Sequence, residues 1–536
     1  MRRLSPASFA LVVALLPGAT PAQEPTQEQP ELRLSLEEAV ARTLENNTDI
    51  AVERYNPQSS AEQVREVLGA YDLFLDSTIG KRSQTDPARN AFSGGDKVNT
   101  GTWTYNLGAS KLLGTGGTVA LAFDNNRTST NNVFSTFNPS FGSSLSASLS
   151  QPLLRNFRID DSRRSLRLAK KNKEISDVQF RQTVINTVAS IKQLYYDLIF
   201  AMDNLEVARK SLSLAQKLLD ENQIKVRVGT LAPLDVVAAE SEVASRDEGV
   251  IVAESALGDA QDNIRRVIFP RNDPASWAVR IVPTDRPTYE SAPVSVDVDA
   301  AIRNALENRT DVVAARKNIE NAETGIQFSR NQTLPGLDLV ASYGGVGLGG
   351  TGLVRDGFGG PVIEEIPGGF GDALSGVFAR DFPTWSVGVN FSYPIPNRSA
   401  RAAAARARIS RDQAQASLAR LEMQVIAEVR SAARAVETDV KRVAATRAAR
   451  VLQERRLDAE QKKFAAGMST SFLVTQAQRD LAVAEASEIQ AISDYRKDVV
   501  IFERVQDAGL GSVGGTSITI ATRSGGVASS RGSSAQ

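Results

Sequence analysis

The side chains that most often carry chemistry, those of cysteine and histidine, do not occur in this sequence. Their absence excludes disulfides, thiolate nucleophiles, cysteine or histidine metal sites and the usual proton shuttle. Pairs of carboxylates, or of serine and lysine, remain as candidates for catalysis. A carboxylate enzyme such as a glycosidase needs two acids that converge in a cleft, and the long helices expected below offer none. We therefore expect no enzyme, no cofactor and no metal site.

The candidate functional residues lie instead in two glycine-containing breaks, VRVGTLAPLDVV at 226–237 and KFAAGMSTSFLV at 463–474. Each break separates two stretches of helix-forming residues. Gly229 and Gly467 can take the left-handed conformation that ends a helix without a Cβ penalty. We therefore expect each break to be the turn of a helical hairpin.

The residues after each glycine can start a returning helix. Thr230 in the first break, or Ser469 to Ser471 in the second, can cap that helix, and Pro233 suits its first turn. Both tips should lie together at one end of the molecule, where they form a docking or gating surface. The expected tip residues are Gly229, Thr230, Leu231, Pro233 and Leu234 in the first break and Gly467, Met468, Ser469, Thr470, Ser471 and Phe472 in the second.

Apolar residues at seven-residue intervals position these breaks. After the first break, one row of apolar residues at this spacing runs from Val236 to Ile264. Before the second break, a less regular row runs from Val429 to Phe464 and has Arg450 at one of its positions. Sustained heptads predict helices that supercoil left-handedly around one another. The stripe before the first break consists of Ile191, Leu198, Leu205, Leu212, Leu219 and Val226.

Two proline-free stretches, 160–228 and 399–466, predict unbroken helices. At about 1.5 Å per residue each is a rod of roughly 100 Å, which no globular domain needs. The returning helices are shorter, so helices at 36–70 and 298–332 are expected to cover the rest of each rod. Pro57 is expected to kink the first of these.

The chain is an internal duplication. LEEAVARTLENNTDI at 36–50 matches VDAAIRNALENRTDV at 298–312, and the order helix, β-like region, long helix, break and returning helix occurs in both halves. Arg2 and Arg3 before an apolar run predict a secretory signal, and a membrane anchor is the alternative. The expected segments are a signal peptide at 1–22, a disordered segment at 23–33, the first repeat at 34–270, a linker at 271–296, the second repeat at 297–510 and a disordered tail at 511–536.

The β-like regions alternate apolar with small or polar residues, as strands with two different faces do. Beyond the N-terminus, no apolar run reaches the roughly 18 residues that a membrane helix needs, so a membrane location would require a β-barrel. A soluble sandwich is the alternative. The formal net charge is zero, which gives no reason to expect nucleic acid as a partner. The candidate strands are 102–112, 118–125, 143–153, 337–345 and 384–395.

The signal sequence, the duplicated opening, the strands and both tip motifs together resemble the TolC family of outer-membrane efflux proteins, over roughly residues 34–507. The resemblance implies a mainly α protein with a β-barrel portion. Its duplicated helix–strand–long helix–helix halves would form a trimeric α-helical tunnel continuous with an outer-membrane β-barrel. The homotrimer would contact outer-membrane lipid and extend into the periplasm of a Gram-negative bacterium.

The function implied by this resemblance is that of an exit duct in a tripartite efflux or type I secretion system. The duct would conduct substrates passively, and its partners would be a periplasmic adaptor protein and an inner-membrane transporter. The alternative is that the chain is itself a periplasmic adaptor with coiled-coil hairpins. A filament-like structural protein is a third possibility, but it leaves the strands unexplained.

The resemblance also marks four gate candidates. Asp235 matches the family's acidic tip position, whereas Leu473 and Gln476 stand where some members have acids. Phe464 occupies an aromatic position without a hydroxyl, and Ser469 stands where the family has arginine. We therefore expect a gate that relies more on packing than on charge, with Asp235 as its main charge. The alternative for Asp235 is a carboxylate favoured at a helix N-terminus by the macrodipole.

One departure from the family concerns the strands. The family usually has two membrane strands per half, yet the first half here offers around four candidates, with a tight turn at GTGG (114–117). The extra hairpin either enlarges the barrel or lies against its rim, and we favour the rim.

Overall fold

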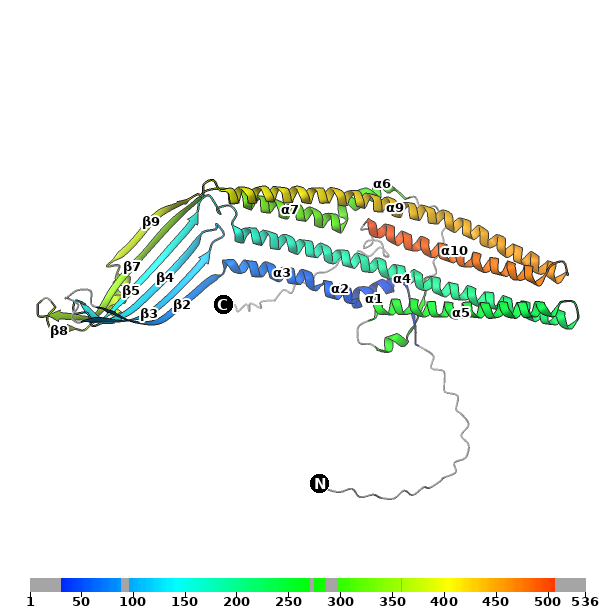
Figure 1. The fold of residues 1–536 in the computed structure, drawn as a ribbon, viewed down its shortest axis with the longest axis horizontal. Helices are drawn as coiled ribbons and strands as arrows, with labels where there is room; N and C mark the ends of the chain where they lie inside the picture. Colours follow the sequence, from blue (N-terminus) through cyan, green and yellow to red (C-terminus); the bar gives the residue numbers. More distant parts are fainter. Residues whose placement is uncertain (1–29, 88–95, 270–273, 286–295, 358, 507–536) are drawn as a thin grey trace, which may run out of the picture.

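A computed structural model describes residues 30–87, 96–269, 274–285, 296–357 and 359–506. A β-sheet lies at one end of the elongated chain, the turns of two helical hairpins lie at the other, and helices run between them (Figure 1). The signal peptide expected at 1–22 and the tail expected at 511–536 lie outside the described residues.

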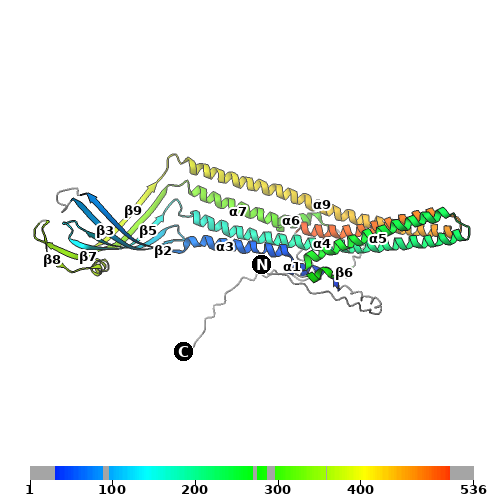
Figure 2. The ribbon, with the colours of Figure 1, turned by 60° about the horizontal axis from the view of Figure 1, so that its bottom comes forward.

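Two long helices form the rods. Helix α4 spans Asp161–Arg227 and α9 spans Arg398–Ala465, within one residue of the predicted stretches at each end. Helices α5 (Pro233–Ile268) and α10 (Ser471–Val505) return from the two turns (Figure 2). None of the helices in the described residues is both long and apolar enough to cross a membrane.

Short helices cover the remainder of each rod in the same order in both halves. Helix α1 ends at Asn46 and α6 ends at Asn308, which are matching positions of the duplicated motif. The structure therefore repeats the sequence duplication down to the site of a helix break. The short helices are α1 (Leu36–Asn46), α2 (Thr48–Glu53) and α3 (Tyr55–Leu68) along α4, and α6 (Val298–Asn308) and α7 (Thr310–Asn331) along α9.

The interruption expected from Pro57 falls three residues before it, between α2 and α3. The chain leaves helical geometry at Asn47, whereas Arg54, the single residue between α2 and α3, keeps helical backbone angles, and Pro57 lies inside the first turn of α3. A proline ring clashes with the carbonyl four residues earlier, here that of Glu53, so the break falls before the proline.

The first half of the heptad stripe of α4 is buried, whereas in the second half the buried position moves to a neighbouring residue. Ile191, Leu198 and Leu205 are buried, but Leu218 then replaces Leu219 as the buried position. A straight helix has 3.6 residues per turn, so a seven-residue pattern rotates slowly around it. Leu218 packs in a cluster with residues of α9 and α10, so α4 turns toward the second hairpin near its end.

Arg450, the polar residue in the looser stripe, pairs across the hairpin. Its guanidinium binds the carboxylate of Glu488 in α10 and that of Glu454 one turn along α9, the latter at 3.2 Å. Glu488 is buried, so this pair satisfies a charge that would otherwise be costly inside the hairpin.

A parallel pair of strands was missed. Strand β1 (Glu31–Leu34) pairs with β6 (Arg280–Pro283), preceded by the short 3₁₀ helix η2 (Pro274–Ala278). The Tyr195 hydroxyl in α4 anchors the pair by donating to the Leu34 oxygen at 2.9 Å. Residues 31–33 are thus ordered, contrary to the predicted disordered segment, because their partner strand lies in the linker between the repeats.

The remaining strands form one sheet in the order β2-β3-β4-β5-β7-β8, with β9 also paired to β7. The β3–β4 hairpin turns at 113–117 and pairs along its whole length with β2 and β5. It widens the sheet, so our preference for the rim was wrong. The 3₁₀ helix η1 (Gly69–Tyr71) precedes strands β2 (Leu73–Pro87), β3 (Lys97–Leu112), β4 (Thr118–Thr130), β5 (Phe137–Pro152), β7 (Gly336–Arg355), β8 (Val362–Ile366) and β9 (Pro383–Ser392).

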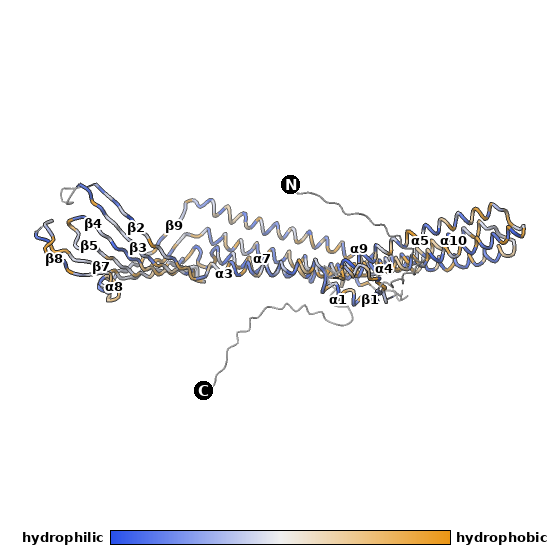
Figure 3. The backbone as a smooth tube through the Cα atoms, turned by 90° about the horizontal axis from the view of Figure 1, so that it is seen from below, coloured by the Kyte–Doolittle hydropathy of each residue, from blue (hydrophilic) through white to orange (hydrophobic). Residues whose placement is uncertain are grey.

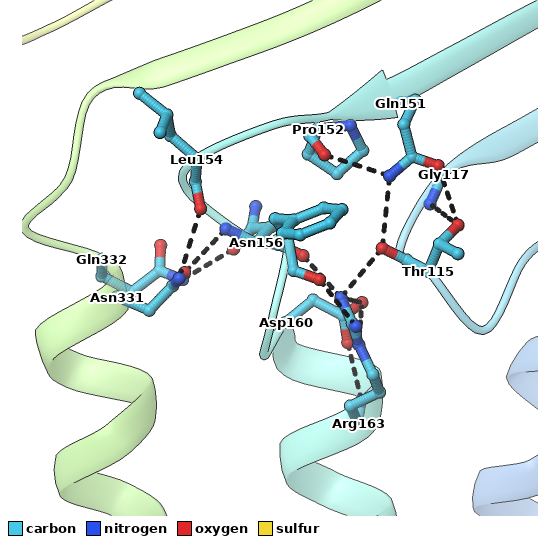
Figure 4. Close-up of polar contacts among 11 residues, drawn as sticks. Thr115, Gly117, Gln151, Pro152, Leu154, Asn156, Asp160, Arg163, Asn331 and Gln332 are labelled. Carbon is cyan, nitrogen blue, oxygen red and sulfur yellow. Dashed lines mark hydrogen bonds and ion pairs between the residues drawn. The ribbon is translucent and has the colours of Figure 1, made fainter.

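The sheet meets the rods at a polar joint with Arg163 at its centre (Figure 4). The Arg163 guanidinium donates to the backbone oxygen of Thr115, in the β3–β4 turn, at 3.2 Å and pairs with Asp160 at 2.9 Å. Asp160 in turn caps α4 by accepting from the Arg163 backbone N–H. Gly116 fits this joint only as glycine, because a Cβ there would lie 2.5 Å from the guanidinium and the residue has φ +85°.

Residues at the C-terminal end of α7, in the second half of the chain, also bind this joint. The side-chain oxygen of Asn331 accepts from the Asn156 backbone at 2.6 Å, and the Gln332 amide donates to the Asn156 side chain at 2.7 Å (Figure 4). Asn156 has φ +67°, a left-handed conformation that asparagine tolerates better than most residues. The two repeats therefore fix together the angle at which the sheet leaves the rods.

Three acids meet between the α9 and α10 helices. Asp439 is buried, and burial together with the neighbouring Asp498 and Asp494 raises its pKa to about 6, while Arg442 opposes the shift. A raised carboxyl pKa contributes stability that is fully present below the unfolded pKa, about 3.9, and is lost as pH rises through the folded value.

We expect Asp439→Asn to stabilise the protein at pH 8 by up to about 3 kcal/mol and to have little effect at pH 4, because asparagine resembles the neutral acid. Thermal unfolding at the two pH values measures this. Asp458→Asn, at an exposed position of the same helix, is the control. Equal effects of Asp439→Asn at both pH values would contradict the assignment.

Candidate functional site at the hairpin tips and the sheet faces

Both hairpin turns have the same backbone geometry. Gly229 has φ +78° and Gly467 has φ +76°. In the first turn the Thr230 N–H donates to the Lys225 oxygen at 2.9 Å, and the Gly229 N–H donates to the Val226 oxygen at 3.0 Å. The second turn repeats both bonds around Gly467. This is the Schellman pattern, and it places a residue of left-handed conformation at each tip.

The returning helices start differently. Thr470 caps α10 by accepting from the Leu473 N–H, but Thr230 does not cap α5, because its hydroxyl donates to Lys225 instead. The residue before α5 is Ala232, which has no side-chain acceptor. Pro233 occupies the first turn of α5 as expected, where its missing N–H costs nothing.

The tips present apolar side chains to solvent. Leu234 is 76% exposed, Met468 is 74% exposed and Phe472 is 70% exposed. Gly229, Thr230, Pro233, Gly467 and Thr470 are also exposed, whereas Leu231 and Ser469 are partly covered. Exposed apolar side chains that gather at one end of a rod favour contact with another macromolecule.

Two of the predicted tip and gate residues are buried against the opposite hairpin instead of being exposed. Phe464 is 4% exposed and Ser471 is 5% exposed. The Lys225 ammonium of α4 lies 3.3 Å from the Phe464 ring centroid and donates to the Phe464 backbone oxygen at 3.0 Å. Asn222, one turn before Lys225, donates to the Ser471 hydroxyl at 2.6 Å. Phe464 and Ser471 therefore join the two hairpins.

A buried carboxylate forms a second link between the hairpins. Glu242 in α5 binds Arg479 in α10 and also accepts from Arg246 on its own helix at 2.8 Å. Burial raises the pKa of Glu242, but the hydrogen bonds from the two arginines outweigh it and hold the pKa below its usual range. The link is thus present at neutral pH and is lost only as pH falls through that lowered value.

The other gate candidates lie outside these links. Asp235 is partly exposed in the first turn of α5 and forms no ion pair with any described residue. Leu473 is 44% exposed, and the Gln476 amide donates to Asp480 at 2.8 Å. The role of Asp235 as the main gate charge stays a prediction.

Sequence reasoning missed the polar residues that join the hairpins, namely Asn222, Lys225, Glu242 and Arg479. Asn222 and Glu242 are buried in the faces where α4 and α5 pack, and both lie beside apolar residues of the heptad pattern. A polar residue at a buried position was the available signal, but its partner lies more than two hundred residues away and cannot be read from spacing.

The sheet has one apolar and one polar face. Paired residues share a face, and the pairings carry the alternation across the long strands except in the outer half of β7, where Val346 and Leu348 lie on the polar face and glycines lie on the apolar one. The polar face carries serines, asparagines and aspartates such as Asp76, Asn106, Asp124, Ser144 and Ser342. The apolar face includes Leu75, Ile79, Trp103, Tyr105, Leu107, Leu121, Phe123, Leu145, Leu149, Tyr343, Trp385, Val387, Val389 and Phe391.

Solved structures define the class of this fold. The outer-membrane channel OprN aligns with a TM-score of 0.63 at 16% identity, covering 88% of this chain and 90% of that one. The Campylobacter jejuni CmeC outer membrane channel aligns with a TM-score of 0.61 at 15% identity, covering 88% and 86%. At these identities the likeness is one of fold, and the fold is that of outer-membrane channels.

Sequence comparison gives the family. The family model of the outer membrane efflux protein matches residues 39–268 and 301–500, so this chain belongs to the outer membrane efflux protein family. The resemblance to the TolC family is confirmed, and the match does not favour the periplasmic adaptor. The family consists of channels, not of enzymes.

Curated relatives match over shorter stretches. Outer membrane protein TolC of Vibrio cholerae serotype O1 is 22% identical over 179 residues, 33% of this chain and 40% of that protein. Outer membrane protein TolC of Escherichia coli strain K12 is 24% identical over 184 residues, 34% and 35% of the two chains. Less than half of either relative is aligned.

Replacing Gly229 by alanine tests the turn geometry. No atom lies within 4 Å of a Cβ placed there, so the cost comes from the left-handed backbone alone. We expect Gly229→Ala to destabilise the tip by about 1 kcal/mol, measured as faster amide hydrogen exchange of the first turn.

Gly249→Ala is the matched control. Gly249 lies within α5, also has open space around a Cβ, and has no left-handed φ. Alanine there should slow exchange by an amount equivalent to roughly 0.5–1 kcal/mol. If both substitutions changed exchange in the same direction, the role of the left-handed glycine would be refuted.

Proposed function

We propose that this protein is the passive outer-membrane exit duct of a tripartite efflux or type I secretion system. Substrates would enter from a periplasmic adaptor and an inner-membrane transporter, which supplies the energy. They would leave the cell through the pore that the sheet helps to enclose. The observation that carries the proposal is the two-faced sheet, largely apolar on one side and polar on the other, whose strands β5 and β9 lead through short connections into rods of roughly 100 Å.

Three copies would close the sheet into a barrel. Strand β2 pairs only with β3, and β9 pairs only with β7, among the described strands. An unpaired edge of this length is a template for another strand, and in a bilayer every backbone polar group needs a partner. Pairing of β2 with β9 of a neighbouring copy would satisfy both edges. The apolar face would then meet lipid, and the polar face would line the pore.

The tips would form the periplasmic end of the duct. Exposed Leu234, Met468 and Phe472 supply an apolar surface for the adaptor. The contacts of Lys225 with Phe464 and of Glu242 with Arg479 would hold the two hairpins of each protomer together in a closed state. Opening would then require that docking partners replace these contacts.

Reconstitution tests the channel itself. We expect the purified protein to form low-conductance pores in planar bilayers, to run as a trimer, and to change its gel migration on heating as outer-membrane barrels do. A periplasmic adaptor would remain without conductance and without heat-modifiable migration. A monomer that conducts no ions would overturn the proposal.

Loss of the buried link should open the tips. We expect Glu242→Gln, or Arg479→Gln, to remove about 1.5–3 kcal/mol of charge-assisted hydrogen bonding and to raise the open-to-closed ratio roughly tenfold or more in single-channel records. The double variant should add little to either single variant, because both remove one contact.

Arg209→Gln is the control for charge loss. Arg209 pairs with Glu254 at 2.7 Å on an exposed surface within the first hairpin, so its loss leaves the contact between hairpins intact. Wild-type conductance is expected. If Arg209→Gln opened the channel as strongly as Glu242→Gln, the specific role of the buried link would be lost.

A further inference from the structure

A short helix lies on the apolar face of the sheet. Helix α8 (Phe370–Ala379) follows β8 and packs on β7 and β5, at the end of the sheet far from the rods (Figure 3). Glycines of β7 allow this close approach, since a Cβ on Gly347 would lie 1.8 Å from the Ala373 oxygen. Gly347 shares the face of Ser143, Asn125 and the exposed Tyr105. Helix α8 therefore lies outside the polar lining.

A groove runs across the apolar face beside this helix. Its volume is about 560 Å³, and the Phe370 ring at the start of α8 meets Phe141 of β5 edge to face at 6.4 Å between centroids. Ile79 in the groove is 73% exposed and Leu107 is 56% exposed. The apolar lining consists of Ile79, Tyr105, Leu107, Phe123, Phe141 and Phe370.

Basic residues stand at the outer end of this groove. Lys81, Trp103 and Arg127 are cross-strand neighbours in one row of the apolar face. The Lys81 ammonium lies 5.1 Å from the Trp103 ring centroid, and the Arg127 guanidinium lies 5.9 Å from that of Phe141. Neither cation has an ion-pair partner among the described residues. With strands about 4.8 Å apart, Lys81 and Arg127 are roughly 10 Å apart along the row.

We propose that this groove binds an anionic lipid of the outer leaflet, with an acyl chain along the apolar lining and the headgroup phosphate between Lys81 and Arg127. The inference rests on the proposed function, because only a membrane-inserted sheet meets lipid on this face. Two observations select the occupant: the groove is continuous with the apolar face of the sheet, and its cations lie at the end where an outer-leaflet headgroup would be. Helix α8 forms the wall that holds one lipid in place.

Tryptophan quenching tests the site, because the chain has three tryptophans. Trp103 stacks on Tyr105 of the groove lining, Trp385 lies on the same face in β9, and Trp277 lies in η2. Trp277→Phe with Trp385→Phe leaves Trp103 as reporter, and Trp103→Phe with Trp277→Phe leaves Trp385. Each is reconstituted in phosphatidylcholine vesicles with a minor fraction of chain-brominated phosphatidylglycerol or, separately, chain-brominated phosphatidylcholine.

The readout is the ratio of quenching by the anionic lipid to quenching by the neutral lipid. We expect a ratio of roughly five or more at Trp103 and about one at Trp385, because basic residues enrich anionic lipid only locally. Lys81→Gln with Arg127→Gln should return the Trp103 ratio to about one. Lys111→Gln, a cation on the same face near the rods, should leave it unchanged. Heat-modifiable migration verifies that each variant assembles.

The outcomes separate the two proposals. If neither lipid quenches Trp385, the sheet is not in the membrane, and the proposed function fails first. If both lipids quench Trp385 but the two tryptophans give equal ratios, the lipid site is refuted while the channel stands. If neither lipid quenches Trp103 and a unique cysteine from Leu107→Cys crosslinks two chains in detergent, a second copy fills the groove and the lipid site is likewise refuted.

Discussion

The structure depends on the polar joint where the chain passes from strand to rod. The Arg163 guanidinium reaches the β3–β4 turn and the cap of α4, and Asn331 and Gln332 of the second repeat reach Asn156 at the same place. Backbone groups that leave a sheet and have not yet entered a helix need partners. Because these side chains supply them, the direction of each rod is set relative to the sheet, and a small angular error there would displace tips roughly 100 Å away.

At the far end of the rods, the two hairpins have the same turn geometry but make different contacts with each other. Both turns use the same Schellman geometry around Gly229 and Gly467, yet the contacts between the hairpins are not symmetric. Lys225 of the first hairpin covers Phe464 of the second, whereas Lys463, at the equivalent position of the second hairpin, pairs with Glu460 of its own helix at 2.7 Å. A duplicated fold can thus place two similar turns side by side while a few polar side chains decide how firmly they are held.

The sheet departs from a simple repeat in a way that changes its outer surface. The β3–β4 hairpin widens the first half, and the segment between β7 and β9 supplies β8 and α8 to the second. Glycines of β7 allow α8 to lie directly on the backbone of the sheet. The apolar face is therefore not uniform around the protomer: a helix forms a wall beside a groove with two cations at its outer end.

Elements that depend on neighbouring residues along the chain could be predicted from the amino-acid sequence alone. Heptads and the absence of proline gave the two rods within one residue, and the glycine breaks gave both turns. Features that depend on distant partners became visible only in the folded chain: the β1–β6 pair, the place of the β3–β4 hairpin, and the contacts of Glu242 with Arg479 and Asn222 with Ser471. The apolar pattern of a helix depends on residues three or four positions apart in the chain. A strand or a buried polar residue needs a partner that only the fold brings close to it.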